Sequence, residues 1–357
     1  MNQDFIQECL DKAISYHKQN KIHQAQLYYL KVLNLDSKNL SALYLLGTLE
    51  CSIKNYESAC KSFQRYLKID PQNSEIHNNI SLAYLGLNDF LNAEYSLKRA
   101  LELNLQYKQA WNNLGNLYKQ LKKYNEAIES YMQAMSIDIN YIDAQYNCAL
   151  LNIEIGDNKL AKKQLQKIHK NQNHQESSLL LANLYKKEGQ YEQAKNIYLN
   201  LIEKFPQNLA AYNNLSSLLI DTNDLDQAQS FLEIVIKIDP NYNEAYNNLS
   251  IITRLNKDYE KSFYYASIAI RFSPNNHLVL NNFALSLLYT EQISLAILQF
   301  KKCIKICPDS NVYYENLALA YQHNKEPELS QKYLEIALQI NPSSTNAQSK
   351  LAQLNET

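Results

Sequence analysis

The residues of this chain best suited to bind a ligand are asparagines that recur at a regular spacing. Seven of them follow one another in steps of 34 residues, with a single step of 67, at Asn79, Asn113, Asn147, Asn214, Asn248, Asn282 and Asn316. Five further asparagines stand immediately before members of this series, at Asn78, Asn112, Asn213, Asn247 and Asn281. An asparagine side chain carries one acceptor and two donors, the same groups as a peptide bond. A row of asparagines can form hydrogen bonds with the backbone of an extended polypeptide, almost independently of the side chains of that polypeptide.

Two amphipathic helices are expected to position each asparagine, and the segment 111–139 shows both of them. Apolar or small residues lie at helical spacing in its first half, at Trp111, Leu114, Gly115 and Tyr118. The same spacing returns in its second half, at Ala127, Ile128, Tyr131 and Ala134. The polar run 122–126 between them predicts a tight turn, so the unit is a helical hairpin.

The hairpin repeats along the whole chain. A small residue opens the second helix at Ala25, Ala59, Ala93, Ala127, Ala161, Ala194, Ala228, Ser262, Ala296 and Ser330. Its partner site in the first helix is also small, at Ala13, Gly47, Ser81, Gly115, Ala149, Ala182, Ser216, Ser250, Ala284 and Ala318. We interpret the paired small sites as places where two helix backbones approach closely.

This pattern resembles the tetratricopeptide repeat. The features that carry the resemblance are the period of 34, the aromatic residues Trp111, Tyr212, Tyr246 and Tyr314 before a Leu-small pair, and a closing proline at Pro71, Pro206, Pro240, Pro274, Pro308 and Pro342. The resemblance implies an all-α fold, a right-handed α-solenoid superhelix of about ten helical hairpins with a C-terminal capping helix. The expected array covers 6–344, with repeats near 6–39, 40–73, 74–107, 108–141, 142–174, 175–208, 209–242, 243–276, 277–310 and 311–344. The capping helix and tail take 345–357.

In this family the first-helix sites that face away from the packed side line a concave groove, and the asparagine series occupies the sixth site of each repeat. The row is similar to the asparagine ladder in the tetratricopeptide superhelix of the O-linked N-acetylglucosamine transferase, where such residues hold substrate peptides. The resemblance is limited to the repeats, so we do not expect it to extend to catalysis. An ordinary structural or solvated row is the alternative, because this chain is rich in asparagine throughout.

The carboxylate clamp, another binding mode of the family, is disfavoured. A clamp that started at Asn112, Asn116 and Asn147 would need basic residues in the next repeat, which offers Glu176 and Leu180 instead.

The composition of the chain and the positions of its cysteines and histidines disfavour several classes of function. The formal net charge of −1 disfavours a nucleic-acid binder or a polybasic membrane binder. The first nine residues lack the basic and apolar regions of a secretion signal, and no membrane-spanning stretch is present, so a cytoplasmic protein is expected. Cys9, Cys148 and Cys303 fall on core sites, and Cys51, Cys60 and Cys307 show no metal-ligand spacing. The seven histidines form no catalytic constellation. We expect no metal, no cofactor and no enzyme activity.

The fifth repeat is irregular. It is one residue short, lacks the closing proline and carries Lys159, Lys162, Lys163, Lys167 and Lys170. The fifth repeat is interpreted either as a solvated helix face with a slightly altered angle between repeats, or as a hinge or a basic docking patch for an acidic partner.

The sequence as a whole predicts a non-catalytic scaffold that binds a partner protein or an extended peptide in the concave groove. The alternatives are a targeting subunit of an enzyme complex, for example with a glycosyltransferase, and a structural protein that self-associates through the ends of the superhelix.

Overall fold

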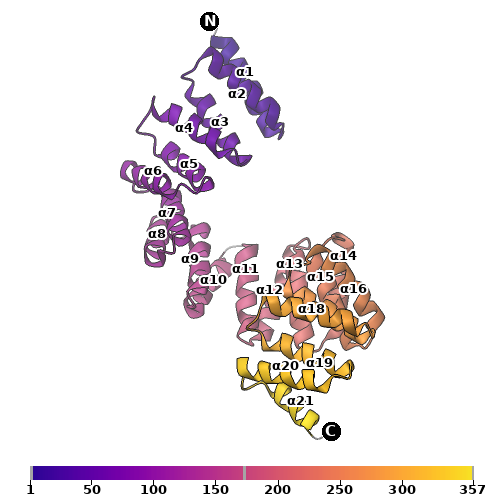
Figure 1. The fold of residues 1–357 in the computed structure, drawn as a ribbon. Coiled ribbons are helices and arrows are strands. Elements are labelled where there is room, and N and C mark those ends of the chain that lie inside the picture. The colour runs from indigo at the N-terminus through magenta and orange to yellow at the C-terminus, as the bar shows by residue number, and fades with distance from the viewer. Residues whose placement is uncertain (1–2, 172–173, 356–357) are drawn as a thin grey trace. The chain divides into compact units, whose positions relative to one another are not determined.

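A computed structural model describes residues 3–171 and 174–355, and every regular element in those residues is an α-helix (Figure 1). The first ten helices are α1 (Gln3–Lys18), α2 (Ile22–Leu35), α3 (Leu40–Ser52), α4 (Tyr56–Leu67), α5 (Ser74–Gly86), α6 (Phe90–Leu103), α7 (Lys108–Gln120), α8 (Tyr124–Ile137), α9 (Ile142–Glu154) and α10 (Asn158–Asn171). They are followed by α11 (Gln175–Lys187), α12 (Tyr191–Lys204), α13 (Leu209–Asp221), α14 (Leu225–Ile238), α15 (Asn243–Leu255), α16 (Tyr259–Phe272), α17 (His277–Tyr289), α18 (Ile293–Ile306), α19 (Asn311–His323), α20 (Pro327–Ile340) and α21 (Thr345–Asn355). The predicted all-α fold of about ten hairpins and a C-terminal helix is confirmed.

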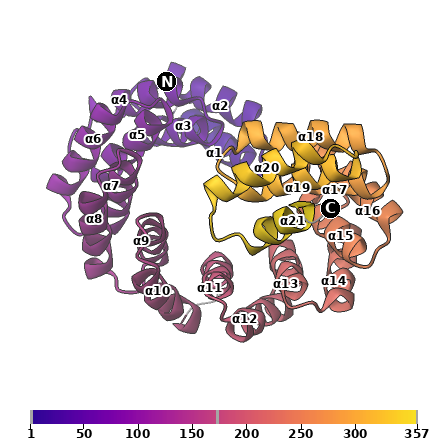
Figure 2. The same ribbon diagram turned by 60° about the horizontal axis from the view of Figure 1, so that its bottom comes forward.

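The chain divides into two compact units, residues 1–177 and residues 178–357. Within each unit, helices that follow one another in the chain, such as α5 and α6 or α15 and α16, pack together, and consecutive first helices such as α5 and α7 or α13 and α15 also touch. In the first unit, Figure 2 shows α3, α5, α7 and α9 on the concave side of an arc, with α4, α6, α8 and α10 on its outer side. The odd-numbered helices therefore form the inner wall of this unit.

Each turn inside a hairpin contains one residue in the left-handed backbone region. These residues are Asn20, Lys54, Asn88, Lys122, Gly156, Gly189, Asn223, Lys257, Glu291 and Lys325. The turn at Lys122 (φ 58°) is closed by backbone hydrogen bonds from Lys122 N to Lys119 O and from Lys123 N to Tyr118 O. Such bonds satisfy carbonyls that a helix end leaves unpaired, which offsets the cost of positive φ in a residue with a Cβ atom.

The turns between hairpins rely on proline and asparagine. All six closing prolines lie in these turns, since proline cannot continue a helix. Four first helices begin after an asparagine whose side-chain oxygen accepts a backbone N–H of the first turn, at Asn39, Asn73, Asn208 and Asn276. Such caps typically contribute about 1 kcal/mol each. Pro327 stands at the start of α20, where the missing N–H costs nothing.

The small sites of the first helices make room for aromatic rings. A Cβ atom added at Gly115 would lie 2.5 Å from Cε1 of Tyr131, and one at Gly47 would lie 2.6 Å from Cε1 of Phe63. At both glycines the space that a Cβ atom would need is therefore taken by a ring, which the sequence did not predict. The small residue leaves space for a ring from the second helix, and that ring fills the interior of the hairpin.

Candidate functional site

The predicted binding asparagines lie on first helices in both units. The first unit carries Asn78 and Asn79 on α5, Asn112 and Asn113 on α7, and Asn147 on α9. The second unit carries the other seven, at Asn213, Asn214, Asn247, Asn248, Asn281, Asn282 and Asn316. Each unit thus has its own row.

In the first unit the asparagines bind one another across adjacent hairpins. The Nδ2 atom of Asn113 donates to Oδ1 of Asn78 at 2.9 Å, and Nδ2 of Asn147 donates to Oδ1 of Asn112 at 3.0 Å. Each bond joins two consecutive first helices. The sequence showed two asparagine series, and the structure links them through an offset of 35 residues.

The second unit repeats this arrangement three times. Asn248 donates to Asn213 at 2.8 Å, Asn282 donates to Asn247 at 2.9 Å, and Asn316 donates to Asn281 at 2.8 Å. The row begins with a variant of the pattern, because Nδ2 of Asn214 donates to Oδ1 of Asn183 at 3.0 Å.

The two series differ in exposure. In the preceding series Asn78, Asn112 and Asn213 are only 4%, 6% and 8% exposed, whereas Asn247 and Asn281 are half-buried. The sixth-site asparagines are all half-buried. For five of them the described part of the chain provides no hydrogen bond to Oδ1, namely Asn113, Asn147, Asn248, Asn282 and Asn316. Each of these amides is held by one N–H and keeps an acceptor and a second N–H for another molecule.

A second set of polar contacts, not predicted from the sequence, joins the two helices of a hairpin. The buried hydroxyl of Tyr131 donates to Oδ1 of Asn116 at 2.7 Å, and the hydroxyl of Tyr198 donates to Oδ1 of Asn183. Burial raises the pKa of both tyrosines, so they remain protonated donors. The signal in the sequence was an asparagine fifteen residues before a tyrosine of the second helix.

Asn214 borders a polar hollow of about 420 Å³ in the second unit. Its walls include Lys186, whose Nζ atom lies 3.0 Å from Oδ2 of Asp221 and donates to Oγ of Ser217 at 2.7 Å. The hollow gives this part of the row room for a polar ligand next to Asn183 and Asn214.

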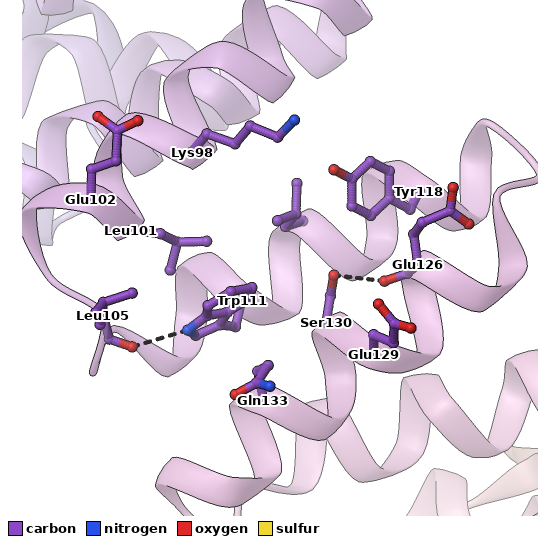
Figure 3. Close-up of a pocket in the computed structure, with 11 residues that line it drawn as sticks. Lys98, Leu101, Glu102, Leu105, Trp111, Tyr118, Glu126, Glu129, Ser130 and Gln133 are labelled. Carbon is purple, nitrogen blue, oxygen red and sulfur yellow. Dashed lines mark hydrogen bonds between the residues drawn. The ribbon is translucent and has the colours of Figure 1, made fainter.

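Trp111 packs against the apolar cluster of α6 and α7. It also lines a second hollow, between α6 and α8 (Figure 3). Its Nε1 atom donates to the backbone oxygen of Leu105 at 3.0 Å. Trp111 therefore both packs against the core and lines the hollow.

The lysines of the irregular fifth repeat lie on α10, and residues 172–173 at its end are outside the described part of the chain. The boundary between the two units follows shortly after, at residue 177. The two interpretations of this repeat, a solvated face and a hinge or basic docking patch for an acidic partner, remain predictions.

All six cysteines are free thiols. Cys9, Cys148 and Cys303 are buried, as their core positions predicted. Burial raises the pKa of the Cys60 thiol to about 11 and that of Cys303 to about 12, so neither forms a reactive thiolate at neutral pH. Within residues 3–171 and 174–355 no three His, Cys, Asp or Glu side chains gather as a metal site would require. No described helix is long and apolar enough to cross a membrane.

Comparison with known families identifies the repeat. Sequence models of the tetratricopeptide repeat match residues 10–74, 74–107, 109–141, 185–250 and 312–344, which together make up more than half of the chain. These matches concern the repeat in general and do not single out the O-linked N-acetylglucosamine transferase. No curated protein matches the chain.

Solved structures share the fold at low sequence identity. The Cut9–Hcn1 hetero-tetramer of the APC/C is 12% identical, with a TM-score of 0.52 over 98% of this chain and 96% of that one. The C-terminal part of a repeat protein from Cytophaga hutchinsonii is 16% identical, with a TM-score of 0.52 over 67% of this chain and 98% of that one. MamA is 25% identical with a TM-score of 0.41, covering 44% of this chain and 92% of its own.

Proposed function

The chain belongs to the tetratricopeptide repeat family, and we propose that it is a non-catalytic scaffold that binds an extended segment of a partner protein along its asparagine rows. Proteins of this family bind other proteins and are generally non-catalytic. The proposal places the protein in the cytoplasm, in keeping with its six free thiols.

The observation that carries the proposal is the orientation of the sixth-site asparagines. Because one N–H of each amide is bound to the asparagine of the preceding hairpin, the amide group cannot rotate freely. Its Oδ1 atom and its second N–H therefore point in a fixed direction. Fixed groups lose less entropy on binding than free side chains, which favours recognition of a flexible peptide.

The ligand best matched to these groups is peptide backbone in an extended conformation. Each amide can accept one backbone N–H and donate to one backbone carbonyl. A net hydrogen bond contributes about 0.5–1.5 kcal/mol. The contacts of one row must also offset the ordering of a disordered segment, so we expect moderate, micromolar affinity.

Two triple variants of the second unit separate binding from structure. The first is Asn248→Ala, Asn282→Ala and Asn316→Ala, which removes the sixth-site amides. The second is Asn213→Ala, Asn247→Ala and Asn281→Ala, which breaks the same three bonds between hairpins but leaves the sixth-site amides in place. The second triple variant is therefore a matched control for loss of stability.

The assay is fluorescence anisotropy with three unstructured, fluorescein-labelled peptides of equal length and unrelated polar sequence. We expect all three to bind the unaltered protein with similar affinity, because the backbone is recognised. The sixth-site triple variant should raise Kd by at least about tenfold, since three contacts of about 0.5 kcal/mol are lost. The control should lose less affinity, and circular dichroism should show both variants to be helical. If the two variants lost equal affinity, the asparagine row would serve only to hold neighbouring hairpins together.

A further inference from the structure

The hollow that Trp111 lines is separate from the asparagine rows. It has a volume of about 460 Å³ and lies between α6 and α8, with residues of α7 between them (Figure 3). Trp111, Leu114 and Tyr118 share one face of α7 through their helical spacing, whereas Asn113 stands on the opposite face. A ligand in this hollow would therefore contact the other side of the array.

The floor of the hollow is apolar and includes an indole ring held in place. Leu101 and Leu114 are buried and line it together with Trp111. The polar atom of Trp111 is already bonded to Leu105 O, so the ring offers only apolar surface to a ligand. Leu105 is 65% exposed at the edge of the hollow. A partner that covered this side chain would remove its apolar surface from water, which is favourable.

The rim of the hollow is negatively charged. It carries three carboxylates, Glu102, Glu126 and Glu129, and one ammonium group, Lys98. Lys98 already pairs with Glu94 at 2.7 Å and Glu102 with Arg99 at 2.9 Å. Within the described residues Glu126 and Glu129 form no ion pair, and Figure 3 shows both on the α8 side of the hollow. Their carboxylates can therefore pair with a cationic group of another molecule.

The preceding repeat provides an internal comparison. A similar hollow of about 330 Å³ lies between α4 and α6. It has Asn92 and Tyr95 at the positions of Glu126 and Glu129, and Lys68 at the position of Glu102. The shape therefore recurs with the repeat, but the negative rim belongs to the hollow between α6 and α8.

We propose that this hollow docks a short basic segment of a partner protein. One aromatic or branched aliphatic side chain enters between Trp111 and Leu114, and a lysine or arginine next to it pairs with Glu126 and Glu129. The apolar floor supplies affinity, and the carboxylates select a basic neighbour because an acidic one is repelled. This site does not depend on the asparagine rows.

The chain contains a built-in probe for this proposal, since Trp111 is its only tryptophan. The ligands are three short peptides of equal length with one central phenylalanine, flanked by lysine, by glutamine or by glutamate. We expect the lysine peptide to change the emission of Trp111 saturably and to bind at least about tenfold more tightly than the glutamine peptide. The glutamate peptide should give no saturation. Added salt should weaken the lysine peptide most, because it screens the charges at the exposed rim.

Surface variants complete the test without disturbing the core. The double variant Glu126→Gln and Glu129→Gln should bind the lysine and glutamine peptides equally, whereas Glu192→Gln with Glu203→Gln, two exposed residues of α12, should change nothing. Leu105→Ser should weaken both peptides. The proposal is overturned if the unaltered protein does not prefer the lysine peptide, or if Glu126→Gln with Glu129→Gln keeps that preference. It is also overturned if emission changes with protein concentration alone, which would make a second copy the occupant.

Discussion

Individual hairpins are held together by a large ring opposite a small residue. Tyr29, Tyr131, Tyr198, Phe63 and Phe300 are among the largest fully buried side chains, and each is preceded sixteen residues earlier by glycine or alanine. Where glycine occupies the small site, the ring is so close that even a methyl group would collide with it. Close packing of this kind makes a hairpin sensitive to a single added carbon atom.

The first prediction at this scale concerns Gly115. Gly115→Ala would place a Cβ atom 2.5 Å from the ring of Tyr131, and the buried ring has little freedom to move. Overpacking of this kind typically costs about 1–3 kcal/mol. We therefore expect a lower denaturation midpoint, followed by circular dichroism at the helical band.

The rescue variant for this prediction comes from the neighbouring hairpin. There Leu97 occupies the ring position and Ser81 the small site, so a non-aromatic side chain can coexist with a Cβ atom. Gly115→Ala combined with Tyr131→Leu should be less destabilised than the sum of the two single changes. Strict additivity would show that the ring is not the cause.

At the scale of elements, the C-terminal helix α21 is fastened by one buried carboxylate. Ala347 packs against Ala318, Leu334 and Ala337 of the last hairpin. Glu315 on α19 is 5% exposed and accepts hydrogen bonds from side chains before and within α21, with Ser344 Oγ at 2.6 Å and Asn346 Nδ2 as donors. Asn311 Nδ2, on the same helix as Glu315, donates a third bond at 2.7 Å.

The shifted pKa of Glu315 shows at which pH its hydrogen bonds stabilise the folded state. Burial alone would raise the pKa, but the three hydrogen bonds outweigh it and lower the pKa below its usual value. A carboxyl whose pKa is lowered by folding stabilises the native state above its unfolded pKa. That stabilisation is lost as the pH falls through the lowered value. We therefore expect α21 to loosen in acid before the rest of its unit.

Glu315→Ala should release α21 at neutral pH. Hydrogen bonds to a charged group contribute about 1.5–3 kcal/mol, so amide exchange across 345–355 should accelerate at least about tenfold. Glu335→Ala on α20 is the matched control, because that glutamate is exposed and accepts a hydrogen bond from Gln331 of its own helix. If exchange of α21 were unchanged in Glu315→Ala, the apolar contacts of Ala347 alone would hold the helix.

The helices were easier to predict from the sequence than the contacts and turns that join them. Spacing of apolar residues placed the hairpins, and Ala347, Leu351 and Leu354 indicated a helix that covers the last one. The Glu315 contacts were not predicted, because a glutamate at the fifth site carries no sign that its partners lie some thirty residues later. The left-handed turns were also hidden, since lysine stands at Lys54 and Lys122 where glycine would have signalled positive φ.

The asparagine rows show the same limit. Their periodicity and their side of the helix followed from the sequence, because both depend on local geometry. The pairing of Asn113 with Asn78 did not, since it depends on how far one hairpin is shifted along the next. Half-burial of the sixth site, against near-complete burial of Asn78 and Asn112, is likewise a property of neighbouring hairpins in contact.

At the scale of the whole molecule, stability is local. Within the described residues of each unit, substantial contacts join helices that are one or two places apart in the chain. In such arrays the free energy is approximately a sum of single-repeat terms and nearest-neighbour terms. A change in one hairpin should therefore affect its neighbours and leave remote hairpins as they were.

The final prediction tests this locality with Ala228→Leu. Ala228 is fully buried on α14, so a leucine there should overpack the hairpin of α13 and α14 by about 1–3 kcal/mol. Amide exchange should accelerate in α13, α14 and the adjoining α15, while α3 to α6 in the first unit keep their protection. Gln227→Leu, one residue earlier on the exposed side of the same helix, introduces the same leucine side chain and should leave amide exchange unchanged. A uniform loss of protection across both units in Ala228→Leu would mean that the array unfolds as one cooperative body, contrary to the pairwise contacts from which it is built.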